Sequence, residues 1–162
     1  MADQQQIELL KQGDTNSWNV WRKEHPETKP DLSETDLSAI KLREVNLSDA
    51  NLSGADLRKA DLSKANLSWS NLVGANLSGA TLNGANLTGA DLSGVSFQNA
   101  AMNDAILSQT TLIDANVSDA DLANANLSDA DLTNASFRGT NLKGAIIRPE
   151  QLGRTRSPDD IP

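Results

Sequence analysis

A bulky apolar residue recurs at every fifth position from Leu32 to Ile147. All 24 of these central positions hold Leu, Ile, Val, Phe or Met. Two positions before each central residue the side chain is usually small, most often Ala, and one position before it is usually Asn or Asp. Ser or Thr commonly follows, so the consensus unit is Ala-(Asn/Asp)-Leu-(Ser/Thr)-X. A single five-residue unit therefore organises most of the chain, as in repeat proteins.

A period of five residues matches neither of the common secondary structures. On an α-helix, successive central residues would step by about 140° and wander around the helix. On a flat strand they would alternate between the two faces. A chain that turns after each unit instead keeps every central residue on the inside. Glycine tolerates turn conformations and falls at several of the expected turns. These glycines are Gly54, Gly74, Gly79, Gly84, Gly89 and Gly94.

Units such as Ala55-Asp56-Leu57-Arg58-Lys59 and Ala75-Asn76-Leu77-Ser78-Gly79 resemble the pentapeptide-repeat family. The resemblance covers about three quarters of the chain, without a break in register. It implies an all-β solenoid, a right-handed quadrilateral β-helix with four units in each coil. The central and small residues then point inward, and the other three positions face solvent. By this analogy the repeats make about six coils, and residues 20 apart lie above one another at the strand spacing of about 4.8 Å.

Residues 1–30 precede the repeats, and their composition predicts a short α-helical cap. Residues 3–11 and 17–24 have helical composition, and Trp18 and Trp21 share one face of the second helix. Two tryptophans in a chain with few aromatic residues need a place to be buried. The open end of a stack of strands offers one. A separate binding helix is the alternative. The segment from Trp18 to Glu24 also resembles leaders of cyanobacterial pentapeptide-repeat proteins.

The repeat body is expected to span residues 31–148, and residues 149–162 form a third region. Pro149-Glu150-Gln151-Leu152 predicts a short turn that covers the last coil. Residues 153–162 are polar and contain two prolines, which predicts a disordered tail.

Catalytic and metal chemistry find no support in the sequence. Cysteine is absent, and the single histidine, His25, stands in a charged segment. The usual transition-metal ligand sets cannot be built without Cys or a second His. Ser and Thr are plentiful but occupy outward repeat positions, where no base would activate them. We therefore expect no catalytic residue, no cofactor and no metal, and a protein that is not an enzyme.

The charge and hydropathy of the chain restrict its partners and its compartment. The net charge of −8 argues against binding to nucleic acid or to anionic lipid. No stretch approaches the roughly 20 apolar residues of a membrane span. The N-terminal residues have no basic region followed by an apolar one. The sequence therefore predicts a cytoplasmic protein with no nucleic-acid or membrane partner.

Sorting the outward residues by their position in a 20-residue coil separates one acidic face from the others. This face carries no Lys or Arg within the repeats. Its acidic residues are Asp31, Glu34, Asp91, Asp114 and Asp131.

Four outward positions hold large apolar side chains, namely Trp69, Val73, Ile106 and Ile113. All four fall around one corner between a nearly neutral face and the acidic face. Single exposed apolar residues are ordinary on protein surfaces. The alternative is a protein-contact site with Trp69 as its anchor.

Two functions follow from these surfaces. The first is a non-enzymatic structural or interaction protein, a rigid rod that binds an unidentified protein. The second, implied by the family resemblance, is a DNA mimic that binds a type II topoisomerase such as gyrase. Asn51 and Asn71 interrupt the acidic column, which favours the first. The protein is expected to be a monomer, or a homodimer that pairs through its C-terminal end at Ile146, Ile147 and Leu152.

Overall fold

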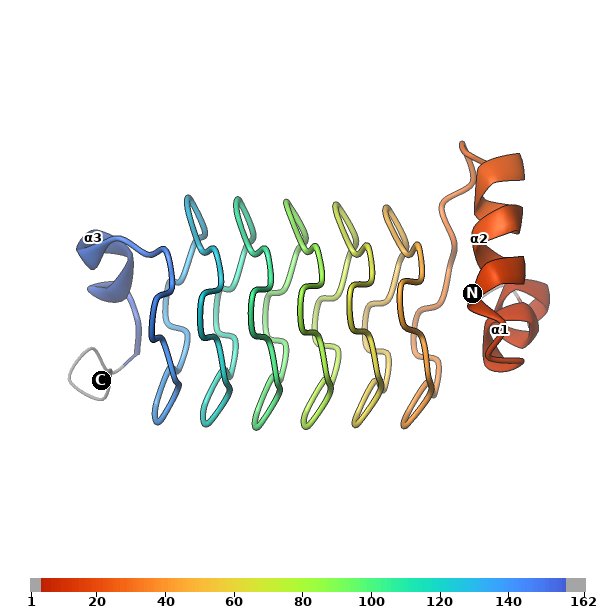
Figure 1. Ribbon diagram of the computed structural model, residues 1–162. Helices are drawn as coiled ribbons and strands as arrows, with labels where there is room; N and C mark the ends of the chain where they lie inside the picture. Colours follow the sequence, from red (N-terminus) through yellow and green to blue (C-terminus); the bar gives the residue numbers. More distant parts are fainter. Residues whose placement is uncertain (1–3, 157–162) are drawn as a thin grey trace.

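The computed structural model describes residues 4–156, and in it the repeats wind into a rod of stacked coils (Figure 1). Parallel bridges join residues that are 20 apart, from Asp31 with Asn51 to Asn126 with Ile146. Backbone hydrogen bonds run from each coil to the next, as from the Leu52 amide to the Asn71 carbonyl at 2.7 Å. The 20-residue register implied by the family resemblance is thus the register of the structure.

A turn follows each central residue from Leu32 to Leu142 and gives the rod its four-sided cross-section. In the first turn of the coil 51–70, the Ala55 amide donates to the Leu52 carbonyl at 3.0 Å. The third residue of each turn from Glu34 to Gly144 has a positive φ, as a type II turn requires. Because a turn comes so often, no strand within residues 4–156 extends beyond a single bridging residue. The β-structure consists of a ladder of such bridges and not of long strands.

Where Asn or Asp precedes a central residue, it stabilises the turn that follows. Its side-chain oxygen accepts a hydrogen bond from the backbone amide two residues later. Asp31 accepts from Ser33 at 3.1 Å, and Asn51 accepts from Ser53 at 3.2 Å. These short side chains are well suited to such turns. The consensus at this position therefore has a local structural cause, independent of charge.

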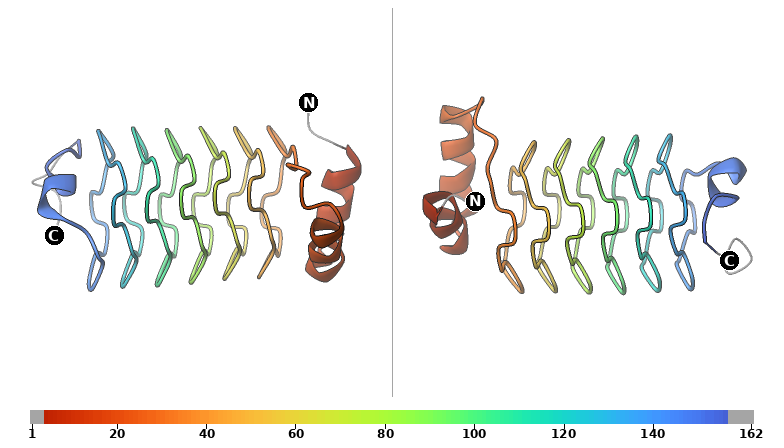
Figure 2. Two further views of the ribbon diagram at one scale, coloured as in Figure 1. Left: turned by 90° about the horizontal axis from the view of Figure 1, so that it is seen from above. Right: turned by 180° about the vertical axis from the view of Figure 1, so that it is seen from behind.

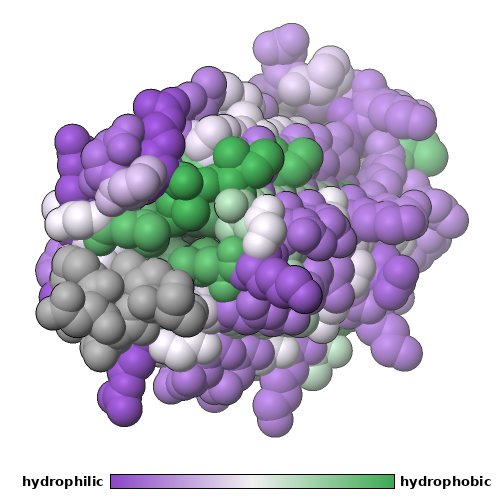
Figure 3. Space-filling view, turned by 60° about the vertical axis from the view of Figure 1, so that its left-hand side comes forward, coloured by the Kyte–Doolittle hydropathy of each residue, from purple (hydrophilic) through white to green (hydrophobic). Residues whose placement is uncertain are grey.

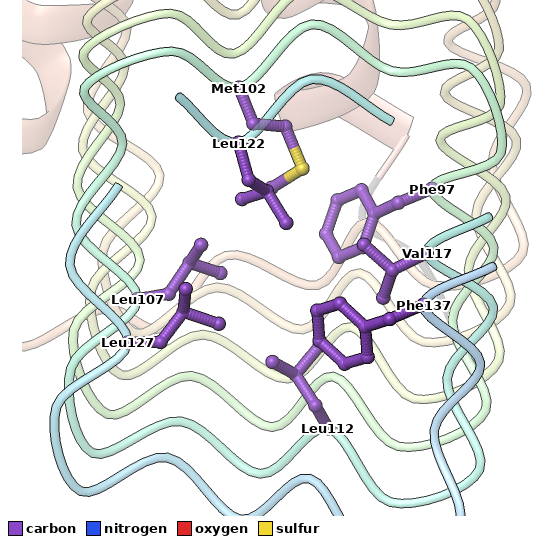
Figure 4. Close-up of a pocket in the computed structure, with 8 residues that line it drawn as sticks. All are labelled: Phe97, Met102, Leu107, Leu112, Val117, Leu122, Leu127 and Phe137. Carbon is purple, nitrogen blue, oxygen red and sulfur yellow. The ribbon is translucent and has the colours of Figure 1, made fainter. Parts of the chain in front are cut away.

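The interior of the rod is a continuous apolar core. The central residues from Leu32 to Phe137 are 0–2% exposed, and the alanines two positions before them are also buried. Figure 4 shows the core of the later coils, where Phe97, Val117 and Phe137 stack one above another. The gap among these side chains is too small to admit a water molecule. The core of these later coils is therefore closely packed.

Two helices lie at the N-terminal end of the rod, α1 (Gln4–Lys11) and α2 (Thr15–Glu24) (Figures 1 and 2). The second helix begins at Thr15, two residues earlier than the sequence predicts. Asp14 is its N-cap and accepts hydrogen bonds from the amides of Asn16 and Ser17, both at 3.1 Å. Satisfying these free amides is what an N-cap does.

The C-terminal end carries α3 (Pro149–Leu152), where the sequence predicts a short turn. The prediction of a disordered tail from residue 153 is wrong for residues 153–156. The Asn134 amide donates to the Arg154 carbonyl at 2.8 Å, and the Arg156 amide donates to the Ala135 carbonyl at 2.9 Å. The backbone of the last coil provides hydrogen-bond partners for Arg154 and Arg156, and the composition of the segment does not indicate them. The rest of the predicted tail, residues 157–162, lies outside the described residues.

Candidate protein-interaction surfaces

Trp69 occupies the third position of a turn, with a φ of 59°. Its ring leans over the next coil and lies against Gly89. A Cβ atom on Gly89 would come closer than 3.0 Å to three ring carbons of Trp69. Trp69 is nevertheless 60% exposed. The ring is therefore supported by the backbone of the next coil and open to solvent elsewhere.

The other three candidate contact residues differ in their exposure. Val73 and Ile106 are each 40% exposed, and Ile113 is partly buried. The four residues lie in four successive coils. Val73 and Ile113 belong to one column, with the polar Ser93 between them.

The surroundings of Trp69 and Val73 are uncharged. No charged residue occurs between Lys64 and Asp91, so the coil 71–90 is neutral on all its faces. Next to Trp69, the Ser68 hydroxyl donates to Asn66 at 2.7 Å. The Trp69 surface therefore consists of a large apolar side chain surrounded by uncharged residues, some of them held by hydrogen bonds.

Turns hold three of the carboxylates of the acidic face, those of Asp31, Asp91 and Asp131. The Ser33 hydroxyl donates to Asp31 at 2.7 Å, and the Thr133 hydroxyl donates to Asp131 at 2.6 Å. These hydroxyl hydrogen bonds, with those of the same residues' amides, hold the pKa of the Asp31 and Asp131 carboxyls below the ordinary value. Both groups are therefore anions that stabilise their own turns.

The acidic face also has basic neighbours, which come from residues after the repeats. Arg156 Nη2 lies 3.9 Å from Asp114 Oδ1, and the charge of Arg154 contributes to the lowered pKa of Asp131. Residues after 148 do not follow the repeat, so their position over this face could not be read from the period. The C-terminal part of the acidic face is partly neutralised as a result. Its N-terminal part retains Asp31 and Glu34, and Glu34 lines a surface cleft together with Lys11 of α1.

Trp18 and Trp21 both contact the apolar interior from α2. Trp18 is fully buried, and its indole Nε1 donates to the Asn46 carbonyl at 2.7 Å. Trp21 is partly buried, with its ring centroid 5.2 Å from that of Trp18. His25 stacks on the Trp21 ring with centroids 5.0 Å apart. The two tryptophans therefore pack at the end of the rod.

The sequence reasoning missed two further side chains of α2 that pair with the first coil. Asn19 donates to the Glu44 carbonyl at 3.0 Å and accepts from the Asn46 amide at 2.8 Å. Arg22 is buried and donates to the carbonyls of Thr28 and Ser48. Together with Trp18, these side chains donate to the carbonyls of Glu44, Asn46 and Ser48. These carbonyls belong to the first coil, which has no preceding coil to pair with. The i, i+1 and i+4 spacing of Trp18, Asn19 and Arg22, which places all three along one side of a helix, was the available signal.

The C-terminal end is less completely covered. Leu142 and Ile147 are central residues, yet both are only partly buried, and Ile146 is 59% exposed. Gln151 of α3 donates to the carbonyls of Leu127 and Ala130, at 2.8 and 2.9 Å. Figure 3 shows apolar surface gathered at this end of the molecule.

Within residues 4–156, no three His, Asp or Glu side chains group in a way that could hold a metal ion. None of the helices described by the structure is long and apolar enough to cross a membrane.

Comparisons with known proteins agree with this architecture. The family model for pentapeptide repeats matches in eight copies, over residues 31–68, 70–109 and 111–148. A pentapeptide repeat protein from the thylakoid lumen of Arabidopsis thaliana is 28% identical, with 76% of this chain and 72% of that chain covered and a TM-score of 0.44.

Two cyanobacterial structures are also similar. HetL, a pentapeptide repeat protein involved in heterocyst differentiation regulation in Nostoc sp. strain PCC 7120, is 31% identical over 82% of this chain and 76% of its own, with a TM-score of 0.36. Rfr23 from Cyanothece 51142 is 26% identical over 80% and 90%, also with a TM-score of 0.36. Comparison with curated proteins gave no significant match. The chain therefore belongs to the pentapeptide-repeat family, whose members form right-handed quadrilateral β-helices.

Proposed function

We propose that this protein is a non-enzymatic rod that binds a partner protein through the surface around Trp69. The proposed rod has six coils over residues 31–148, a cap formed by α1 and α2, and a terminal element from residue 149. The observation that carries the proposal is the support of the Trp69 ring by Gly89. A side chain held in place before binding loses less conformational entropy when a partner covers it. Tryptophan is also the residue type most enriched among energetically dominant interface residues.

Affinity capture from the native host tests this proposal with a matched pair of variants. The Trp69→Ser/Val73→Ser double variant should lose a specific partner that the wild-type protein retains. Val20→Ser is the control, because Val20 on α2 is 52% exposed but lies at the N-terminal end, away from Trp69. Both variants should remain folded in the absence of urea. The unfolding midpoint of Val20→Ser should match the wild type, and that of the double variant should be lower because the covered surface of Trp69 is lost. An identical set of partners for all three proteins would refute the proposal.

A DNA mimic that binds gyrase is the alternative. The acidic face would have to supply the phosphate-like charge. Asn51 and Asn71 interrupt that face, and Arg156 lies beside Asp114. These features favour the interaction protein. A supercoiling assay separates the two functions, since a mimic should inhibit or protect gyrase and an unrelated rod should leave the reaction unchanged.

The C-terminal end supports a second proposed contact, with another copy of the chain. Ile146 is exposed there, and the central residues Leu142 and Ile147 are incompletely covered. Sedimentation should detect a dimer whose dissociation constant rises for Ile146→Ser and is unchanged for Val20→Ser. A wild-type protein that sediments as a monomer at every concentration would contradict pairing.

A cytoplasmic location also remains a proposal. The Arabidopsis relative comes from the thylakoid lumen, so compartments differ among similar proteins. Fractionation of the native host, with detection of the protein by an antibody, tests the location directly.

A further inference from the structure

Asn83 and Gly84 form the only Asn-Gly pair in the sequence. Both residues are exposed, at the second and third positions of a turn in the coil 71–90. In an Asn-Gly pair, the glycine amide nitrogen can attack the asparagine side-chain carbonyl, because glycine has no side chain to obstruct the approach. Most other asparagines in the repeats precede a bulky central residue. The pair is therefore the place where spontaneous deamidation is chemically easiest.

The next coil holds both reacting groups. The Gly84 amide donates to the Asn103 carbonyl at 2.8 Å. The Asn83 side-chain oxygen accepts from the Asn103 amide at 3.0 Å and from its side-chain nitrogen at 3.3 Å. The Asn103 carbonyl thus binds the nucleophile, the Gly84 amide. The backbone amide and the side-chain amide of Asn103 both bind the oxygen of the electrophile, the Asn83 side-chain carbonyl. Attack requires Gly84 and Asn83 to leave these partners together.

The repeat sequence explains why Asn83 bonds to the coil above it. In most repeats, the amide after the central residue is bound by the Asn or Asp two positions earlier. At Asn103 that position is Ala101, which has no side-chain acceptor. Asn83, from the coil below, supplies the missing acceptor. The same side chain is therefore both part of the coil contact and the reactive amide.

We propose that Asn83 is a deamidation site whose reactivity is controlled by the contact between the coils 71–90 and 91–110. When the contact opens, a bond forms between the Gly84 nitrogen and Asn83 Cγ. The bond from Cγ to Nδ2 breaks, and ammonia leaves with the Gly84 amide proton. Water then opens the resulting succinimide at either carbonyl, which leaves aspartate or isoaspartate at position 83.

Isoaspartate would make the opening permanent. It adds a methylene to the main chain, so the Gly84 amide could no longer reach the Asn103 carbonyl in the ladder register. In a solenoid each coil contacts only its neighbours, so local openings need not involve the whole rod. Isoaspartate at position 83 would therefore identify molecules in which the coils 71–90 and 91–110 have separated at least once.

Peptide mapping by mass spectrometry after incubation at mildly alkaline pH tests the proposal. The folded wild-type protein should deamidate at Asn83 at least about tenfold more slowly than the same protein in urea, since reaction needs a prior opening. Asn83→Gln should remove the product from this peptide. Equal deamidation rates in the folded protein and the unfolded chain would refute the proposal that the folded structure controls the reaction.

Two core variants then locate the contact that controls the reaction. Leu82→Ala removes the buried residue beside Asn83, and Leu42→Ala removes the corresponding residue of the same column in the coil 31–50. Leu82→Ala should accelerate deamidation several-fold more than Leu42→Ala. Equal rates in the two variants would show control by global unfolding and would overturn the assignment to this pair of coils.

Discussion

The support of Trp69 by Gly89 predicts a specific cost for Gly89→Ala. Gly74→Ala is its matched control, because both glycines have a φ of +67° in equivalent turns of the same coil. A Cβ atom on Gly74 would have nothing within 4 Å. Both substitutions place a side chain at positive φ, which costs about 1 kcal/mol. Any further loss in Gly89→Ala reports the displacement of the Trp69 ring.

The size of that further loss follows from the hidden surface of Trp69. Trp69 is 60% exposed, so about two fifths of the residue's surface is covered. Fully enclosed aromatic side chains bury about 150–250 Å², so the covered part is about 60–100 Å². At about 25 cal/mol per Å², this burial contributes about 1.5–2.5 kcal/mol. The stem of the side chain stays covered when the ring moves, so we expect Gly89→Ala to cost about 1 kcal/mol more than Gly74→Ala.

Urea unfolding measures this difference through the midpoint, with the slope unchanged if the folded state keeps its compactness. Tryptophan fluorescence provides a second observation. Quenching by acrylamide should increase in Gly89→Ala and not in Gly74→Ala, because only the first variant moves a tryptophan. Equal midpoints and equal quenching in the two variants would refute the support of Trp69 by Gly89.

Three further predictions concern the frame that presents these surfaces. Leu77→Ala should lower the free energy of unfolding by about 2–5 kcal/mol in urea titrations, since Leu77 is fully buried, and a neutral result would contradict its inward position. The lowered pKa of Asp31 and Asp131 stabilises the fold above the ordinary carboxyl pKa, so the urea midpoint should fall as the pH drops below about 4. Asp131→Asn should weaken that pH dependence, because an amide oxygen accepts the same hydrogen bonds without titrating; an unchanged profile would contradict this role. Arg22→Ala should destabilise the protein by about 1–3 kcal/mol in thermal or urea unfolding, because it leaves the carbonyls of Thr28 and Ser48 without their donor.

Hydrogen exchange would add a spatial check on the Arg22 prediction. Loss of protection in Arg22→Ala should be concentrated at the N-terminal end, because each coil exchanges contacts only with its neighbours. A uniform loss along the rod would argue that α2 stabilises all coils cooperatively.

The regular part of the fold could be predicted from the sequence because its interactions are periodic. Each central residue, such as Leu52, meets the same surroundings as its equivalents, so one five-residue unit predicts the burial of them all. The number of units in a coil came from the family resemblance and not from the residues. A signal for it was present, however. Several large residues at the third turn position are followed 20 residues later by glycine, as Glu34 by Gly54 and Trp69 by Gly89.

The irregular contacts became visible only in the tertiary structure. Arg156 reaches Asp114, and Asn19 pairs with the backbone of Glu44 and Asn46, across separations that no period relates. These residues meet because the ends of a coil stack leave backbone groups without partners, and the nearest chain supplies them. The sequence by itself determined the inward ladder from Leu32 to Ile147, since burial there depends on local spacing. The tertiary structure alone decided how the two ends are covered and how the outer charges and Trp69 are surrounded, because those depend on which segments pack side by side.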